Sequence, residues 1–211
     1  MSQTRVLLVR HGQSEWNAAG RWQGQADPPL TDTGRQQARA ASRSIGAVDA
    51  VFASDLQRAA ETAAIVSGEL GVGPVVLDPD LRERDAGEWS GMTRAEIEER
   101  YPGYLGGAPS FSVTHERRPP GWEPDASVQE RALRALRRIA EEVGGGDVLA
   151  VTHGGLIYAV EDALGHRGPV ERLANGAGRW VVVDADGHLS LGDRVLLVDE
   201  HDAPVTVPGA I

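Results

Sequence analysis

Short, continuous apolar runs alternate along the chain with longer stretches in which apolar residues recur every three or four positions. Runs rich in branched aliphatic side chains are typical of strands that are buried on both faces of a parallel sheet. They predict strands over residues 6–9, 49–53, 75–77 and 147–152. The periodic stretches predict helices over 31–45, 54–70, 93–100, 127–143 and 156–165.

The last part of the chain departs from this alternation. Residues 180–183 and 188–191 flank an Asp-Ala-Asp-Gly turn and predict an antiparallel hairpin, and residues 195–198 predict one more short strand. Residues after Asp199 are expected to form a loose tail. Because no repeat or linker divides the chain, we expect a single three-layer α/β domain over residues 1–211. Its mixed, mostly parallel sheet would be flanked by helices.

Composition narrows the classes of function. The net charge is −10 and all 21 basic residues are arginine, so a nucleic acid or an anionic membrane is disfavoured as a partner. The absence of cysteine excludes disulfides and thiolate chemistry. No leader segment and no apolar run near the ~20 residues of a membrane span are evident. We therefore expect a soluble, cytoplasmic protein.

Two of the predicted strands are followed by residues that could form a catalytic site. Arg10, His11 and Gly12 follow the first strand, and His153 and Gly154 follow the strand over 147–152. In open α/β sheets the ligand crevice lies at the carboxyl ends of the strands. If the two strands are parallel neighbours, both imidazole rings would meet in one crevice. From these residues alone, ordinary loop positions remain an alternative.

Four segments in order resemble the signature blocks of the histidine phosphatase superfamily. They read LVRHGQSEWN, SDLQRAAETA, LRERDAGEWSG and VTHGG, and the resemblance extends over residues 6–175. Within the superfamily they are similar to the branch that contains cofactor-dependent phosphoglycerate mutases and related small phosphatases. The resemblance implies a phosphoglycerate mutase-like fold and a reaction through a phosphohistidine.

The resemblance also implies roles for individual residues. His11 would be the nucleophile, since a neutral imidazole is competent near neutral pH. Arg10, Arg58 and His153 would complete the phosphate pocket, where fixed cationic donors stabilise the charge of the transferring phosphoryl group. Glu83 would be the proton donor to the leaving oxygen.

Further phosphate contacts are implied at four positions. Asn17, Gln23 and Gly24 would donate hydrogen bonds to the phosphate, and Gly154 would leave its backbone open to a phosphate oxygen. Ser14 could either contribute to this pocket or cap the helix that follows the first strand.

Residues 91–127 bear on the choice of reaction. Mutases of the family carry a long insertion there, with tyrosine and paired arginines that grip the substrate. Here the stretch is short, and Arg117-Arg118 precede two prolines. Residues 124–127 read PDAS where the family usually has GES, which puts a supporting glutamate in doubt. We therefore expect a phosphatase for small phosphorylated metabolites, with a phosphoglycerate mutase as the alternative. A catalytically inactive phosphate-binding protein is less favoured, since every key position is intact.

The remaining polar residues carry weaker predictions. The motifs that usually hold metals are missing, so no metal or cofactor is expected. The four other histidines are interpreted as surface residues, and the arginines of the long helix as a solvated face. These are His115, His166, His188 and His201, and Arg131, Arg134, Arg137 and Arg138. A homodimer is left open.

Overall fold

One sheet of six strands forms the centre of the protein, in a computed structural model that describes residues 2–105, 118–166 and 172–198. The strands lie side by side in the order β3-β2-β4-β1-β5-β6. The first four are parallel, and β5 and β6 are antiparallel to their neighbours. The strands are β1 (Thr4–Arg10), β2 (Ala50–Ala53), β3 (Val75–Leu77), β4 (Gly146–Thr152), β5 (Ala177–Val183) and β6 (Leu189–Leu196).

Helices connect the parallel strands, and local signals set several of their ends. Thr31 caps α2 by accepting a hydrogen bond from the Gly34 amide, and Thr93 forms a capping box with Glu96 at the start of α4. Gly71 ends α3 in the left-handed conformation. The helices are α1 (Glu15–Ala18), α2 (Asp32–Ser44), α3 (Gln57–Leu70), α4 (Arg94–Arg100), α5 (Asp125–Val143) and α6 (Gly154–Ala163), with short 3-10 turns at Pro79–Leu81 and Gly87–Trp89.

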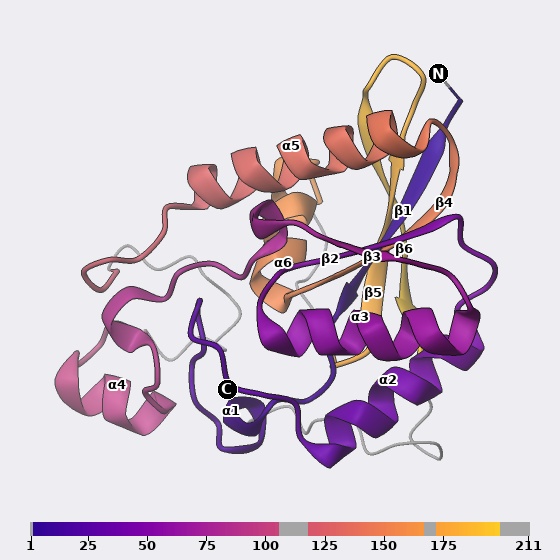
Figure 1. Cartoon of the computed structure of the whole chain (residues 1–211). Coiled ribbons are helices and arrows are strands. Elements are labelled where there is room, and N and C mark those ends of the chain that lie inside the picture. The colour runs from indigo at the N-terminus through magenta and orange to yellow at the C-terminus, as the bar shows by residue number, and fades with distance from the viewer. Residues whose placement is uncertain (1, 106–117, 167–171, 199–211) are drawn as a thin grey trace.

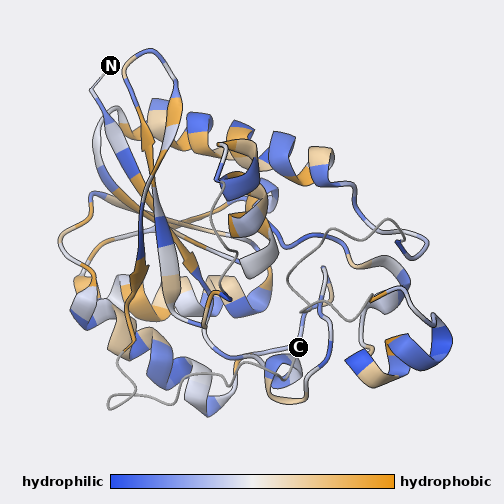
Figure 2. Cartoon of the chain, turned by 180° about the vertical axis from the view of Figure 1, so that it is seen from behind, coloured by the Kyte–Doolittle hydropathy of each residue, from blue (hydrophilic) through white to orange (hydrophobic). Residues whose placement is uncertain are grey.

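The side chains of the central strands alternate between two apolar layers. Leu7 and Val9 of β1 pack with α2 and α3, whereas Val6 and Leu8 face α5 and α6. Figure 1 shows these helix pairs on opposite sides of the sheet. Helix α5 changes between hydrophobic and hydrophilic colours along its length, as expected of an amphipathic helix (Figure 2). The predicted three-layer α/β fold with a mostly parallel sheet is confirmed.

Some predicted boundaries were wrong. Helix α3 begins at Gln57 rather than at Ser54, because Leu56 keeps an extended backbone. The Ser54 hydroxyl hydrogen-bonds His153 Nε2 at 2.9 Å instead of capping the helix in the usual way. Helix α5 starts two residues early, at Asp125. The hairpin is confirmed, but the predicted last strand over 195–198 is not a separate element, because residues 195 and 196 are the end of β6 and residues 197 and 198 lie beyond it.

Several sequence predictions lie outside the described residues. These are the tail after Asp199, the positions of His115 and His201, and Arg117. In the part of the chain that the structure describes, no helix combines the length and the apolar character needed to cross a bilayer.

Candidate active site

Strands β1 and β4 bring the two motif histidines together. The parallel register pairs Arg10 with Thr152, so His11 and His153 follow at the same end of the sheet. The His11 amide donates to the Thr152 carbonyl at 3.0 Å, and the centroids of the two imidazole rings are 5.1 Å apart. The predicted meeting of the two rings at the carboxyl ends of neighbouring parallel strands is confirmed.

The surroundings of His11 select one tautomer of its ring. Nδ1 lies 2.6 Å from the Gly12 carbonyl oxygen, which can only accept, so Nδ1 carries the hydrogen. Nε2 accepts a hydrogen bond of 3.2 Å from Arg58 Nε. Burial, followed by the charges of Arg58 and Arg10, lowers the pKa of His11 well below its usual value. The ring is therefore neutral at neutral pH, with its lone pair on Nε2.

Two buried arginines supply positive charge beside this ring. Arg10 donates to the Leu173 carbonyl at 2.6 Å. Arg58, which is fully buried, donates to the carbonyls of Gly24 and Ala26 at 2.9 and 2.7 Å. Burial lowers the pKa of Arg10, and it lowers the pKa of Arg58 to about 10. Both side chains remain cations at neutral pH.

A cleft of about 140 Å³ opens over His11. The predicted site residues that line it are Arg10, His11, Asn17, Gln23, Gly24, Glu83 and Gly154. The other two predicted residues, Arg58 and His153, are fully buried, and both contact the His11 ring. All nine predicted site residues therefore lie at one place in the fold.

Asn17 lines this cleft and carries a buried donor without a partner among the described residues. Its Oδ1 accepts hydrogen bonds from the Ser14 amide and from Asn175 Nδ2, at 3.2 and 3.3 Å. Its Nδ2 is buried and has no hydrogen-bond partner among the described residues. A buried donor without an acceptor is costly, and an anionic ligand in the cleft would satisfy it. Ser14 caps α1, and its hydroxyl also donates to Gln23 Oε1 at 2.7 Å.

Glu83 enters the cleft from the loop after the first 3-10 turn. Its carboxylate accepts hydrogen bonds from the amides of Arg84 and Gly155, at 2.8 and 3.1 Å. A Cβ atom at position 155 would lie 2.3 Å from Glu83 Oε1. Gly155 is thus a site residue that the sequence analysis missed, although the second glycine of the THGG motif was the available signal.

Other residues around the cleft also escaped the sequence analysis. The rings of Trp22 and Trp89 stack edge to face with centroids 5.3 Å apart, and Trp122 lies 5.5 Å from Trp89. Of these, Trp22 and Trp122 line the cleft. The remaining lining residues are Arg21, Arg84, Ala86, Gly155, Tyr158 and Arg172. The aromatic residues are far apart in the sequence, so spacing did not reveal that they gather here.

One prediction about a supporting residue was wrong. Arg131 pairs with Glu123, which directly precedes the altered residues 124–127, at 2.8 Å. The Arg131 side chain is only 11% exposed, so it does not belong to a solvated face. Arg118 approaches Asp125 at 3.5 Å and lies over the Trp122 ring.

Among the described residues, no group of three or more metal-binding side chains is found.

Comparisons with known proteins agree with this geometry. Residues 6–188 match the family described as histidine phosphatase superfamily (branch 1). A metal-independent phosphoserine phosphatase of Arabidopsis thaliana is 34% identical over an alignment of 178 residues that covers 82% of this chain and 74% of that protein. A glucosyl-3-phosphoglycerate phosphatase of Mycolicibacterium vanbaalenii is 36% identical over an alignment of 195 residues that covers 88% of this chain and 81% of that protein.

Solved structures give the same result. The mycobacterial glucosyl-3-phosphoglycerate phosphatase complexed with VO3 has a TM-score of 0.78 and 30% identity, covering 90% of this chain and 97% of that one. Proteins named as phosphoglycerate mutase or mutase-like are also similar, at 36% identity.

Proposed function

The chain belongs to branch 1 of the histidine phosphatase superfamily, and we propose that it hydrolyses small phosphomonoesters through a phosphohistidine on His11. One observation carries the proposal. The neutral His11 ring, with its lone pair on Nε2, lines the same cleft as the Glu83 carboxyl group. A nucleophile and a proton-transfer group at one anion-binding cleft are what phosphoryl transfer to water requires.

In the first step, His11 Nε2 attacks the phosphorus atom and the bond from phosphorus to the ester oxygen breaks. Glu83, in its acid form, gives its proton to that oxygen, so the alcohol leaves neutral. Arg58 Nε, which donates to His11 Nε2 in the free protein, would turn its hydrogen bond to a phosphoryl oxygen. Arg10 and the unpartnered Nδ2 of Asn17 would stabilise the other oxygens.

In the second step, water attacks the phosphohistidine. The Glu83 carboxylate takes a proton from the water, the bond from nitrogen to phosphorus breaks, and the electron pair returns to His11 Nε2. Inorganic phosphate leaves, and both residues regain their starting protonation states. His153 would keep the His11 ring in place through the contact of the two rings.

The chemistry around the cleft supports a leaving group that is itself polar or anionic. Arg21, Arg84 and Arg172 lie among its lining residues, beside the indole rings of Trp22 and Trp122. The relatives named above act on phosphoserine and on glucosyl-3-phosphoglycerate, both of which carry a carboxylate. We therefore put phosphorylated small carboxylic acids first among the substrates to test.

A phosphoglycerate mutase is the second candidate, because mutases are among the similar proteins. Arg117 and Arg118 kept the mutase open as an alternative, and only one of the two lies among the described residues. Arg117 lies outside the described residues, and Arg118 is directed to Asp125 and Trp122. Labelled 3-phosphoglycerate separates the two functions. A phosphatase delivers most of the label to inorganic phosphate, whereas a mutase delivers it to 2-phosphoglycerate faster than phosphate is released.

The cytoplasmic location, the absence of a nucleic-acid partner and the option of a homodimer stay predictions from the sequence. Size-exclusion chromatography with light scattering would determine the oligomeric state directly.

A further inference from the structure

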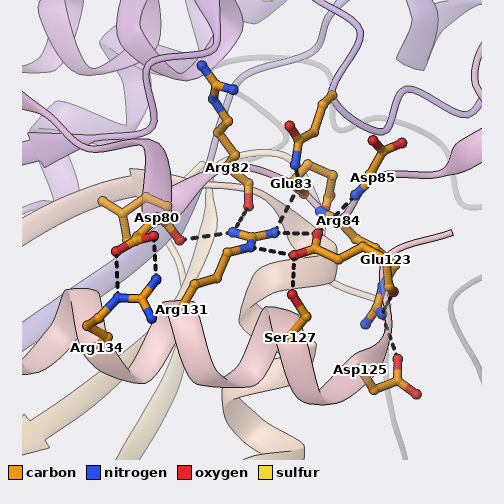
Figure 3. A network of polar contacts seen from close by, with 12 residues as sticks. Asp80, Arg82, Glu83, Arg84, Asp85, Glu123, Asp125, Ser127, Arg131 and Arg134 are labelled. Atoms are coloured by element: carbon orange, nitrogen blue, oxygen red, sulfur yellow. Dashed lines mark hydrogen bonds and ion pairs between the residues drawn. The ribbon is translucent and has the colours of Figure 1, made fainter. Parts of the chain in front are cut away.

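Arg131 lies beneath the loop that carries Glu83. From the second turn of α5, its Nη1 donates to the carbonyls of Asp80 and Arg82, at 2.9 and 2.6 Å. Its Nη2 donates to the carbonyl of Glu83 itself at 3.0 Å. Figure 3 shows the guanidinium group at the centre of these contacts. A single side chain thus binds three carbonyl groups within four consecutive residues.

Glu123 holds the other side of this guanidinium group. Its two carboxylate oxygens accept from Nε and Nη2 of Arg131, at 2.8 and 2.9 Å. The same carboxylate accepts from the Asp85 amide and the Ser127 hydroxyl, both at 3.1 Å. Burial is the largest single influence and raises the pKa of Glu123. The hydrogen bonds and charge of Arg131, together with the hydrogen bonds from the Asp85 amide and Ser127, outweigh it and lower the pKa overall. The pair is therefore charged, and it binds the loop on both sides of Glu83.

On the basis of the proposed function, we propose that Arg131 is a positioning residue for Glu83. The Glu83 carboxylate accepts hydrogen bonds from the backbone amides of Arg84 and Gly155, and both bonds can form only while the backbone of Glu83 stays in place. Arg131 holds that backbone through its hydrogen bond to the Glu83 carbonyl. The planar fork of arginine can serve several acceptors at once, which the single ammonium group of lysine cannot do in the same geometry.

Arg134 provides a matched control on the same helix. It lies three residues further along α5 and binds the carboxylate of Asp80, so it contacts the same loop. Its side chain is 54% exposed, and both of its contacts go to a side chain rather than to the loop backbone. A change at Arg134 removes a surface ion pair and leaves the carbonyls at 80, 82 and 83 with their partner.

The test compares kcat/KM for p-nitrophenyl phosphate, whose leaving group needs no proton, with that for an alkyl phosphomonoester, whose leaving group does. The ratio kcat/KM reports the steps up to release of the alcohol, where the acid acts. The variants are Arg131→Lys, Glu83→Gln, the double variant and Arg134→Lys. Competitive inhibition by inorganic phosphate is measured in each, because it reports the phosphate pocket alone.

We expect Arg131→Lys to lower kcat/KM for the alkyl ester by about 10²-fold, as a misplaced catalytic group does, and for p-nitrophenyl phosphate by less than about fivefold. Inhibition by phosphate should stay within about twofold of the parent, and Arg134→Lys should change nothing beyond that range, as for an exposed ion pair. In the Glu83→Gln background, Arg131→Lys should cost less than about threefold more, since residues that act through one another are not additive.

The other outcomes overturn the inference in distinguishable ways. If Arg131→Lys slows both esters equally and weakens phosphate inhibition, Arg131 supports the whole site and not Glu83. If Glu83→Gln itself does not discriminate between the esters, Glu83 is not the proton donor, and the proposed function and this inference fail together. If Arg131→Lys folds poorly, Glu123→Gln takes its place, because it weakens the ion pair that holds Arg131. A loss confined to the alkyl ester would support the inference, and equal losses on both esters would count against it.

Discussion

Replacing Gly155 with alanine would place a methyl group in the space that the Glu83 carboxylate occupies. The added Cβ atom would lie 2.3 Å from Oε1, whereas ordinary contact begins near 3.4 Å. Oε1 must therefore retreat by about 1 Å, and it can do so because it ends a flexible side chain. A shift of that size in a catalytic group costs about 10²-fold in rate. We expect this loss in kcat/KM for alkyl phosphomonoesters and little loss for p-nitrophenyl phosphate.

The stability of the protein should hardly change. Alanine in α6 gains up to about 1 kcal/mol over glycine, and the weakened hydrogen bond to the Gly155 amide costs about 1 kcal/mol. The two terms nearly cancel, so thermal unfolding should keep its midpoint while activity on alkyl esters falls. Gly68→Ala in α3 is the matched control, because apart from its chain neighbours and the nearby backbone of its own helix no atom lies within 4 Å of the new Cβ. Retention of alkyl ester activity within about threefold in Gly155→Ala, the range of a neutral change, would refute the placement of Glu83.

Three further predictions follow from the same site. Arg58→Ala should lower kcat/KM by about 10²–10³-fold, as loss of one preorganised donor does, and it should weaken inhibition by vanadate. Arg134→Ala is the control and should leave kcat/KM and vanadate inhibition unchanged. Equal losses in the two variants would mean that the phosphate pocket is misplaced. Activity should survive EDTA, and strict dependence on added Mg²⁺ would indicate different chemistry. Stability should fall in acid, because burial lowers the pKa of His11 and His153 below the unfolded value of about 6.5. The unfolded chain then binds protons first, so the contribution is complete above that pH and declines below it by about 1.4 kcal/mol per pH unit for each histidine. Urea unfolding between pH 7.5 and 5.5 measures this slope, and a flat profile would show that both rings accept protons freely in the fold.

Much of the fold could be predicted from the sequence, because the helix-capping residues and the pattern of apolar positions indicate the same elements. Capping at Thr31, Thr93 and Gly71 sets helix ends within a residue or two of the prediction. The apolar runs of β1 and β4 fix a buried parallel pair. The prediction failed where a side chain serves a distant partner. Ser54 has the residue type of a helix cap, yet its hydroxyl meets His153, 99 positions away.

The same physical reason separates the predictable part of the site from the rest. His11 and His153 sit at strand ends, where chain direction alone determines their meeting. Arg131 looked like one of several solvated arginines on an amphipathic helix. Its burial depends on the carbonyls of residues 80–83, about 50 positions earlier, which no local pattern specifies. Glu123 escaped notice because it precedes the altered stretch at 124–127, and only its contact with Arg131 reveals its role.

Direct trapping of the phosphoenzyme tests the central claim. Substrate labelled in its phosphoryl group is mixed with enzyme and quenched within the first turnover, and the labelled peptide is identified. A phosphohistidine on His11 predicts an adduct that is labile in acid and stable in base, absent from His11→Ala, and formed at a rate no slower than turnover. Label on any other residue, or a His11→Ala enzyme that keeps its activity within about tenfold, far less than removal of a nucleophile costs, would contradict the account.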